Sequence, residues 1–308
     1  MALGEFELIR RFFHRAGSGN GDDCAALQPS PGQQWLVSTD MLVEGRHFLS
    51  TVDPHALGHK ALAVNLSDLA ACGAAPRAFF LAVALPQADA DWLAAFSRGL
   101  FALADAHGIV LAGGDTTRGP LNLCITVMGE SPAPLWRRGA RVGDDLWVSG
   151  TLGDARLALE AFRGTLQLER EAFQACRTRM ERPTPRIALG QALRGVASSC
   201  IDVSDGLLGD LRHVLEASGV GAVLKLDALP RSPWLAAQDP TMQHRCLLTG
   251  GDDYELLFTA APGAALPDLG LPLSRIGRIV EAPGLFLRDA QGHPVAFDGR
   301  GFDHFNTP

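Results

Sequence analysis

Aspartate residues recur beside glycine and at the ends of apolar segments along this chain. Charged side chains are rarely buried without a partner, and glycine lets the backbone approach a ligand closely. Aspartate offers a short, hard oxygen ligand, and several such units together suit Mg²⁺ ions that bridge nucleotide phosphates. Six segments have this pattern, and they contain Asp23, Asp40, Asp68, Asp115, Asp202 with Asp205, and Asp252.

Aspartate is also common in turns and at helix N-caps for local reasons. The pairs Asp115-Thr116 and Asp205-Gly206 each allow such a cap, and any one segment taken alone favours that local interpretation. Six segments in both halves of the chain favour a metal site instead. Whether they meet in space stays open at this level.

Several familiar phosphate-handling and hydrolase motifs are absent from the sequence. There is no G-x-x-x-x-G-K-[ST] segment, no protein-kinase H-R-D or D-F-G, and no G-x-S-x-G. The glycine-rich stretch GSGNGDD lacks the spacing of a dinucleotide-binding loop. Lys60 and Lys225 are the only lysines, so phosphate groups must be held by metal, backbone amides or arginine.

Composition narrows the class of protein. The chain has 308 residues, which predicts two domains. Its net charge of -7 and the lack of a basic stripe argue against a nucleic-acid partner. The longest apolar stretches are too short to span a membrane, and the N-terminal residues do not resemble a signal peptide. The six cysteines are not paired as C-x-x-C, as expected for reduced thiols in the cytoplasm.

The hydrophobic pattern predicts mixed helices and strands in both halves, and hence two α/β or α+β domains. Asp53 and Pro54 are predicted to cap a helix that runs to residue 71, and a second helix is expected over residues 89–107. Prolines 132 and 134 open an interdomain connection. The domains are therefore assigned to residues 1–140 and 141–308. Strands are expected at residues 35–43, 77–85, 109–112, 121–129, 144–150, 200–203, 222–226, 254–259, 275–279 and 285–287.

Seven segments in order resemble the thiamine-monophosphate kinase family along essentially the whole chain. They are GDDCAAL, STDMLVEGRHF, KALAVNLSDLAACGA, GGDTTRGP, IDVSDGL, GGDDYELLF and GFDHF. Pieces such as GGDTT are shared with aminoimidazole ribonucleotide synthetase, selenophosphate synthetase and a hydrogenase maturation factor. STDMLVEGRHF and the terminal GFDHF distinguish this family from those relatives.

The resemblance implies an aminoimidazole ribonucleotide synthetase-like fold. In it, an N-terminal ATP- and Mg²⁺-binding domain pairs through its sheet in a homodimer, and a mixed α/β C-terminal domain closes the substrate site. It implies ATP-dependent phosphorylation of thiamine monophosphate, the last step of thiamine diphosphate biosynthesis. The implied Mg²⁺ positions are Asp23, Ser38, Thr39, Asp40, Asp68, Asp115, Asp202 and Asp205. The implied ATP positions are Gly114, Asp115, Arg137 and Ser204, and those for thiamine phosphate are His47, Asp252 and Phe302.

The acceptor is itself an anionic phosphate, so it needs no strong general base. Positioning and charge neutralisation should then carry the catalysis. The hypothesis is direct in-line transfer without a phosphoenzyme, with Asp40, Asp68 and Asp115 as the central metal ligands. Asp252, Phe302 and His107 depart from the family's usual Glu, Tyr or Trp, and Tyr. His47 is expected to contact the acceptor phosphate, although a lone histidine is more often structural.

Three rival functions remain. Another ATP-using member of the same fold group would act on a different small molecule, although no Cys precedes Cys24 as selenophosphate synthesis would require. A nucleotide-sensing dimer would bind ATP without turnover. A two-metal phosphatase would release phosphate without ATP.

Overall fold

The protein is described here by a computed structural model that covers residues 5–15 and 27–297. The chain divides into two compact units. The first comprises Met1–Leu69 and Ala74–Pro132, and the second comprises Ala70–Gly73 and Ala133–Pro308. Residues 133–140, which the sequence assigned to the N-terminal domain, therefore group with the second unit.

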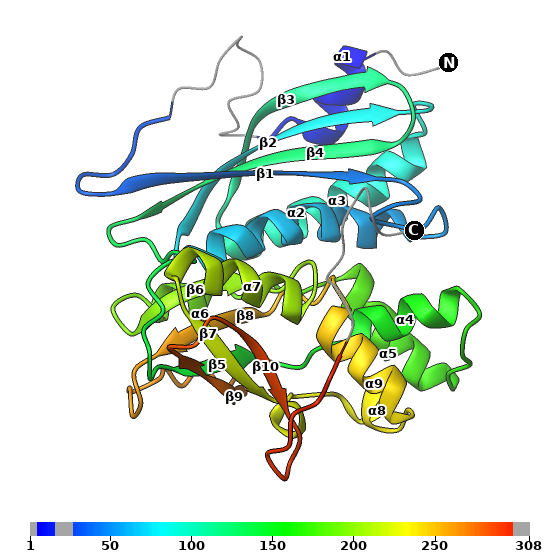
Figure 1. Ribbon diagram of the computed structural model, residues 1–308. Coiled ribbons are helices and arrows are strands. Elements are labelled where there is room, and N and C mark those ends of the chain that lie inside the picture. The colour runs from blue at the N-terminus through cyan, green and yellow to red at the C-terminus, as the bar shows by residue number, and fades with distance from the viewer. Residues whose placement is uncertain (1–4, 16–26, 298–308) are drawn as a thin grey trace. The chain divides into compact units, whose positions relative to one another are not determined.

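The first unit is a four-stranded sheet with two long helices on one face (Figure 1). Its strand order is β1-β4-β2-β3, in which β4 runs antiparallel to β1 and β2, and β2 and β3 are parallel. The elements are α1 (Glu5–Leu8), the π-helical η1 (Ile9–Phe13), β1 (Gln34–Val43), α2 (Pro54–Ala71), β2 (Ala75–Leu85), α3 (Ala90–His107), β3 (Val110–Arg118) and β4 (Asn122–Ser131).

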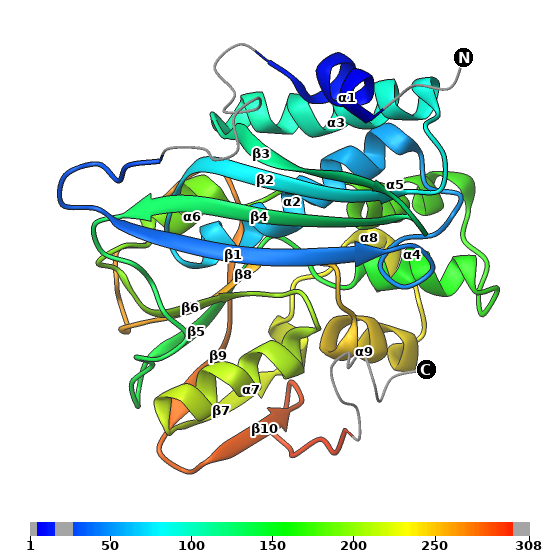
Figure 2. The same ribbon diagram turned by 90° about the horizontal axis from the view of Figure 1, so that it is seen from above.

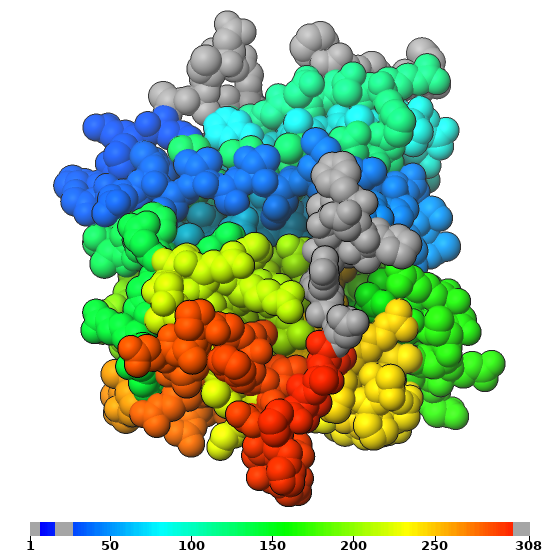
Figure 3. Space-filling model, viewed as in Figure 1, coloured from blue at the N-terminus to red at the C-terminus, as the bar shows by residue number. Residues whose placement is uncertain are grey.

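The two faces of this sheet differ sharply in burial. On β4, Leu123, Ile125 and Val127 are buried toward the helices, whereas the alternate residues are only half-buried. On β1, Val37 and Met41 are exposed on the opposite face. The space-filling view shows β1, in blue, along the surface of the unit (Figure 3). One face of the sheet is thus core and the other is open to solvent in the single chain.

Helices α2 and α3 approach each other closely at two glycines. A Cβ at Gly58 would lie 2.1 Å from the carbonyl oxygen of Phe96, and one at Gly99 would lie 1.9 Å from that of His55. As predicted, Asp53 caps α2 through a bond from the amide of Ala56 at 3.1 Å. These two helices are therefore tightly packed beneath the sheet, and α2 carries the candidate residue Asp68.

The second unit contains a six-stranded sheet with the order β10-β7-β9-β5-β8-β6. The β10–β7 pair is parallel and the other pairs are antiparallel. Its strands are β5 (Asp145–Ser149), β6 (Ala197–Asp202), β7 (Gly221–Lys225), β8 (Leu256–Ala260), β9 (Leu273–Val280) and β10 (Gly284–Arg288). Its helices are α4 (Asp154–Phe162), α5 (Arg170–Glu181), α6 (Ile187–Ala192), α7 (Leu207–Ser218), the 3-10 helix η2 (Leu226–Ala228), α8 (Pro233–Ala236) and α9 (Pro240–Thr249).

Helices of the second unit form two groups around this sheet. Helix α7 packs on β6 and β10, and α4 packs with α5, α8 and α9 (Figures 1 and 2). The apolar core includes Leu146 and Val148 of β5 and Leu257 of β8, all fully buried. Loops that follow β6 and precede β8 lie at the margin of this core, and they carry the candidate residues Ser204, Asp205 and Asp252. Among the described residues, no helix is long and apolar enough to cross a membrane.

Candidate active site

In the first unit, β1 and α2 bring three candidate residues together. The hydroxyl of Ser38 donates a short hydrogen bond to Oδ2 of Asp68. The backbone amide of Asp40 donates to Oδ1 of the buried Asn65 at 3.1 Å. Ser38 and Asp40 are two residues apart on the strand, so both side chains point to the face that α2 covers. The i, i+3 spacing of Asn65 and Asp68 places both on one side of the helix.

Thr39 lies on the opposite face of the sheet. It is exposed, and its hydroxyl is 2.8 Å from that of Thr126 on β4. Three consecutive strand residues cannot direct their side chains to one ion, because alternate residues point to opposite faces. Any metal contact from Thr39 on the side of Asp40 would have to use its backbone carbonyl.

Gly114 and Asp115 lie within β3 rather than at a helix cap. Gly114 pairs with Leu81 of β2, and a Cβ there would lie only 1.9 Å from the Leu81 carbonyl oxygen. Glycine is therefore required for the close approach of the strands, whatever its role toward a ligand. Asp115 pairs with Ala82, and both are exposed.

Asp40 and Asp115 sit on the two edge strands of the sheet. Three strand spacings separate β1 from β3 in the order β1-β4-β2-β3, which is about 14 Å along the sheet. Across the sheet, Asp40 is aligned with Ile125 and Leu81, which are both buried. Asp115 is aligned with Ala82, which is exposed. The two carboxylates of one chain therefore start from opposite edges and opposite faces of the sheet.

His47 follows β1 in a tight turn. Its Nδ1 accepts from the amide of Val43 at 2.9 Å, and its own amide donates to the Val43 carbonyl at 3.0 Å. The neutral ring must therefore carry its proton on Nε2. The buried Lys60 of α2 donates to the His47 carbonyl at 3.2 Å. The turn fixes the orientation of the His47 ring, and Lys60 places its amino group at the His47 backbone. Both features suit a contact between His47 and an anion.

His107, the position at which the family often has tyrosine, is the last residue of α3. Burial lowers its pKa, and the nearby His59 lowers it further. The ring is therefore neutral at neutral pH.

In the second unit, Asp202 ends β6, and the loop at residues 203–206 leads into α7. The carboxylate of Asp210, in the first turns of α7, binds this loop from within. Its Oδ2 accepts from the amides of Ser204 at 3.1 Å, Asp205 at 3.2 Å and Gly206 at 3.1 Å. These three amides are therefore already bonded within the unit.

Asp210 is almost fully buried. Burial and then repulsion from Asp205 raise its pKa to about 7, although the three amides favour the ionised form. It was not among the residues proposed from the sequence, and its only local signal is an acid four residues into a helix that follows an Asp-Gly pair.

Asp252 lies in the segment between α9 and β8, which is bonded to the 203–206 loop. The amide of Asp252 donates to the Ser204 carbonyl at 2.9 Å, and that of Tyr254 donates to the Val203 carbonyl at 2.8 Å. The amide of Val203 donates in return to the Glu255 carbonyl at 2.8 Å. The candidate substrate contact and the candidate nucleotide contact of this unit are thus held at a fixed spacing.

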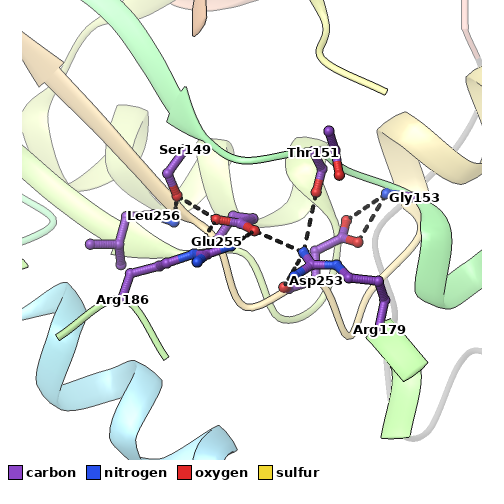
Figure 4. A network of polar contacts seen from close by, with 8 residues as sticks. All are labelled: Ser149, Thr151, Gly153, Arg179, Arg186, Asp253, Glu255 and Leu256. Atoms are coloured by element: carbon purple, nitrogen blue, oxygen red, sulfur yellow. Dashed lines mark hydrogen bonds and ion pairs between the residues drawn. The ribbon is translucent and has the colours of Figure 1, made fainter. Parts of the chain in front are cut away.

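Two buried carboxylates anchor the segment that carries Asp252 (Figure 4). Both oxygens of Asp253 accept from the amide of Gly153, at 2.9 and 3.0 Å. Glu255 accepts from Arg186 Nε at 2.7 Å, from Arg179 Nη2 at 2.8 Å and from Ser149 Oγ at 2.6 Å. Sequence reasoning missed this network, although an acid directly before the apolar strand LLF was a visible signal.

The charges of this network perturb one another. Burial raises the pKa of Asp253 well above its usual value, against the effect of Arg179 and the Gly153 amide. Burial alone would lower the pKa of Arg179, but Glu255 and Asp253 outweigh it and raise that pKa.

Arg137 lies in the segment before β5, which is fastened at two points. The Trp136 carbonyl accepts from the amide of Cys200 on β6 at 2.9 Å. The hydroxyl of Ser218, at the end of α7, accepts from the amides of Gly139 at 3.1 Å and Ala140 at 3.2 Å. The Arg137 side chain itself is exposed. Its backbone is thus positioned by the same strand and helix that flank Ser204.

Asp23 and Phe302 lie outside the described residues. Within the described ranges, no group of three or more His, Cys, Asp or Glu side chains is placed to hold a metal ion by itself.

Comparison with known proteins identifies the family. The model of the AIR synthase related protein N-terminal domain matches residues 21–131, and that of the C-terminal domain matches residues 141–290. The thiamine-monophosphate kinase of Salmonella typhimurium is 47% identical over 333 aligned residues, which cover 100% of both chains. The chain belongs to the thiamine-monophosphate kinase family. The family predicted from the seven sequence segments is therefore confirmed, as is the two-domain α/β fold.

Solved members of the family have the same fold. The crystal structure of thiamine-monophosphate kinase from Stenotrophomonas maltophilia is 45% identical, with a TM-score of 0.84, and the match covers 93% of this chain and 97% of that one. A structure described as AaThiL complexed with AMPPCP and TMP is 31% identical, with a TM-score of 0.81 and 99% coverage of both chains.

Proposed function

We propose that this protein is a phosphotransferase that uses ATP to phosphorylate thiamine monophosphate to thiamine diphosphate, the last step of thiamine diphosphate biosynthesis, in the cytoplasm. The observation that carries the proposal is 47% identity to a thiamine-monophosphate kinase across 100% of both chains. The relative in complex with AMPPCP and TMP supports ATP as co-substrate and thiamine monophosphate as acceptor.

The reaction would be a direct in-line transfer. The acceptor phosphate is already anionic and can attack the terminal phosphate of ATP without a strong base. The main barrier is repulsion between two polyanions, so alignment and neutralisation dominate. Arg137 and Ser204 would contact ATP, with Gly114 and Asp115 on the nucleotide side. His47, Asp252 and Phe302 would contact the thiamine phosphate.

Several Mg²⁺ ions are part of the proposal. Mg²⁺ in nucleotide enzymes is usually bound by one or two carboxylates together with substrate phosphates and water. The neighbouring Ser38 and Asp68 oxygens and the exposed Asp115 fit such sparse sites, which need no preformed cluster of three acids. The proposed ligands are Asp23, Ser38, Thr39, Asp40, Asp68, Asp115, Asp202 and Asp205. When bound, the ions would neutralise charge on the phosphates.

The decisive experiment follows thiamine diphosphate by chromatography after incubation of the protein with ATP, Mg²⁺ and thiamine monophosphate. Metal-dependent product is expected. Asp115→Ala should lower turnover by about a hundredfold or more, because loss of a metal ligand removes several kcal/mol of transition-state stabilisation. Asp91→Ala, which removes another exposed aspartate of the first unit, is the matched control and should leave turnover unchanged.

Other outcomes point to the rival functions. ATP binding without product would favour another acceptor or a nucleotide sensor. Phosphate release without ATP would favour a phosphatase. A phosphorylated protein trapped during turnover would rule out direct transfer.

We further propose that the protein is a homodimer that pairs through the open face of the first unit's sheet. Val37 on this face is 58% exposed, and Met41 and Val43 beside it are exposed as well. Exposed apolar patches of this kind often mark protein interfaces. Val37→Lys should shift the mass measured by light scattering from dimer to monomer. Val142→Lys, at an equally exposed valine of the second unit, is the control. A wild-type monomer would contradict the proposal.

A further inference from the structure

The segment at residues 252–255 has an unusual backbone. Asp252 has a φ of 67° and Tyr254 a φ of 53°, and they are the only non-glycine residues with positive φ in the described part of the chain. Such conformations are strained for residues with a Cβ and persist only where the surroundings impose them.

The surroundings of this segment do impose it. Asp253 and Glu255 are buried, and Figure 4 shows how they reach the amide of Gly153 and the guanidinium groups of Arg179 and Arg186. Their side chains therefore fix the backbone on either side of Tyr254. Only Asp252, among these four residues, has a half-buried rather than a buried side chain.

The side chain of Tyr254 is directed at Asp252. Its hydroxyl donates to Oδ1 of Asp252 at 3.0 Å, and the residue is buried, with 8% of its surface exposed. A buried ring on a fixed backbone has little freedom, so its hydroxyl selects one rotamer of the neighbouring carboxylate. Aspartate would otherwise turn about two side-chain torsions.

We propose that Tyr254 is a positioning residue that holds the Asp252 carboxylate in the orientation that receives thiamine monophosphate. This rests on the proposed function, in which Asp252 contacts that substrate. A carboxylate suits the cationic thiazolium or the amino group of thiamine, and both interactions depend on direction and distance. Tyr254 acts through Asp252 and takes no part in the transfer itself.

The test is the isosteric Tyr254→Phe variant, which removes only the hydroxyl. A buried hydrogen bond to a charged group is worth roughly a ten- to hundredfold change in an equilibrium constant. Asp252 is half-buried, so water can replace part of this bond, and KM for thiamine monophosphate should rise about 3- to 10-fold. The kcat and the KM for ATP should stay within about twofold, because neither depends on Asp252. Thr249→Val, which removes a hydroxyl that donates to the Arg245 carbonyl within α9, is the matched control and should leave all three constants unchanged.

A double-variant cycle separates positioning from a general structural effect. In an Asp252→Ala background, Tyr254→Phe should have no further effect on KM for thiamine monophosphate, because its target is gone. An equal effect in both backgrounds would overturn the proposal. So would an unchanged KM in the single variant, or a rise in both KM values together.

A second readout uses the fact that Tyr254 is the only tyrosine of the chain. Labelling with ¹³C-tyrosine gives a single set of ring resonances, which should shift when thiamine monophosphate is added to the wild type and shift far less in Asp252→Ala. An equal shift in both proteins would contradict action through Asp252.

Failure of the proposed function would look different. In that case the wild type itself would not phosphorylate thiamine monophosphate. Turnover by the wild type, with no response of its KM to Asp252→Ala, would leave the kinase standing and overturn the role of Tyr254.

Discussion

Replacement of Glu255 by glutamine should destabilise the second unit strongly. Glu255 is fully buried and accepts hydrogen bonds from two arginines and from Ser149. The variant keeps the size of the side chain and one carbonyl oxygen but removes the charge that Arg179 and Arg186 share. Both guanidinium groups would remain in place without their anion.

The size of the effect follows from burial. Removal of one partner of a buried ion pair costs about 3–5 kcal/mol. The arginine side chains are 23% and 16% exposed, so water can partly compensate them. We therefore expect about 3–4 kcal/mol, which for a unit of this size lowers Tm by roughly 6–16 °C. Scanning calorimetry of both proteins measures this shift.

The control is an ion pair of equally good geometry on the surface. Arg15 binds both oxygens of Asp105, at 2.8 and 3.1 Å, but the two side chains are 45% and 61% exposed. Asp105→Asn should cost less than about 1 kcal/mol, because water screens exposed pairs. If Glu255→Gln lowered Tm no more than Asp105→Asn, the reasoning that burial makes this network a structural anchor would be refuted.

Three further predictions concern other parts of the fold. Ser218→Ala should raise KM for ATP about 2- to 5-fold, with kcat nearly unchanged, because it frees the backbone around Arg137; steady-state kinetics test this. Burial raises the pKa of Asp154, although a hydrogen bond from Ser232 opposes this shift. Asp154 therefore contributes fully to the free energy of unfolding below the pKa of 3.8 that its carboxyl has in the unfolded chain, and this contribution declines as the pH rises through its pKa in the folded protein. Asp154→Asn should therefore flatten the decline of Tm from acid to neutral pH. Gly99→Ala should lower the free energy of unfolding by about 1–3 kcal/mol, because the alanine Cβ would clash with the His55 carbonyl. Alanine at an open helix position would instead raise it, and urea titration measures which change occurs.

Elements with strong local signals were predictable from the sequence. The aspartate cap at residue 53 and the periodic segments over residues 54–71 and 89–107 predicted α2 and α3 almost to the residue. The same signal, Asp239 followed by Pro240, opens α9 but was not used, and that helix was missed. Helix α5 was missed because its buried stripe is narrow and most of its other residues are polar.

Strand β3 shows that contacts between strands can override the local conformational preferences of the residues. The sequence predicted a strand only to residue 112, because glycine and polar residues disfavour strands. The structure continues β3 through Gly114 and Asp115 to Arg118. Close approach to β2 requires glycine at this point, as the 1.9 Å distance from a Cβ at Gly114 to the Leu81 carbonyl indicates.

Candidate ligands were readable from motifs, but the residues that hold them were not. Arg179 and Arg186 precede Glu255 by 76 and 69 residues, and no spacing rule connects them. No motif singled out Asp210, yet its carboxylate accepts from three amides of the loop before it. Single-sequence patterns report on neighbours along the chain, whereas these contacts depend on the fold.

The buried hydrogen bonds of the second unit hold the loops that carry Ser204 and Asp252 in fixed positions. In-line transfer between two phosphates loses rate when the groups are misplaced by about 1 Å. The loops that carry Ser204 and Asp252 share three backbone hydrogen bonds, so neither can shift without the other. Asp210 secures the first loop and Glu255 the second, and both carboxylates are buried among donors of the protein itself. Both side chains accept hydrogen bonds from the protein itself and so hold the two loops in position. This explains why the unit has buried acids beside those proposed to contact ATP and thiamine phosphate.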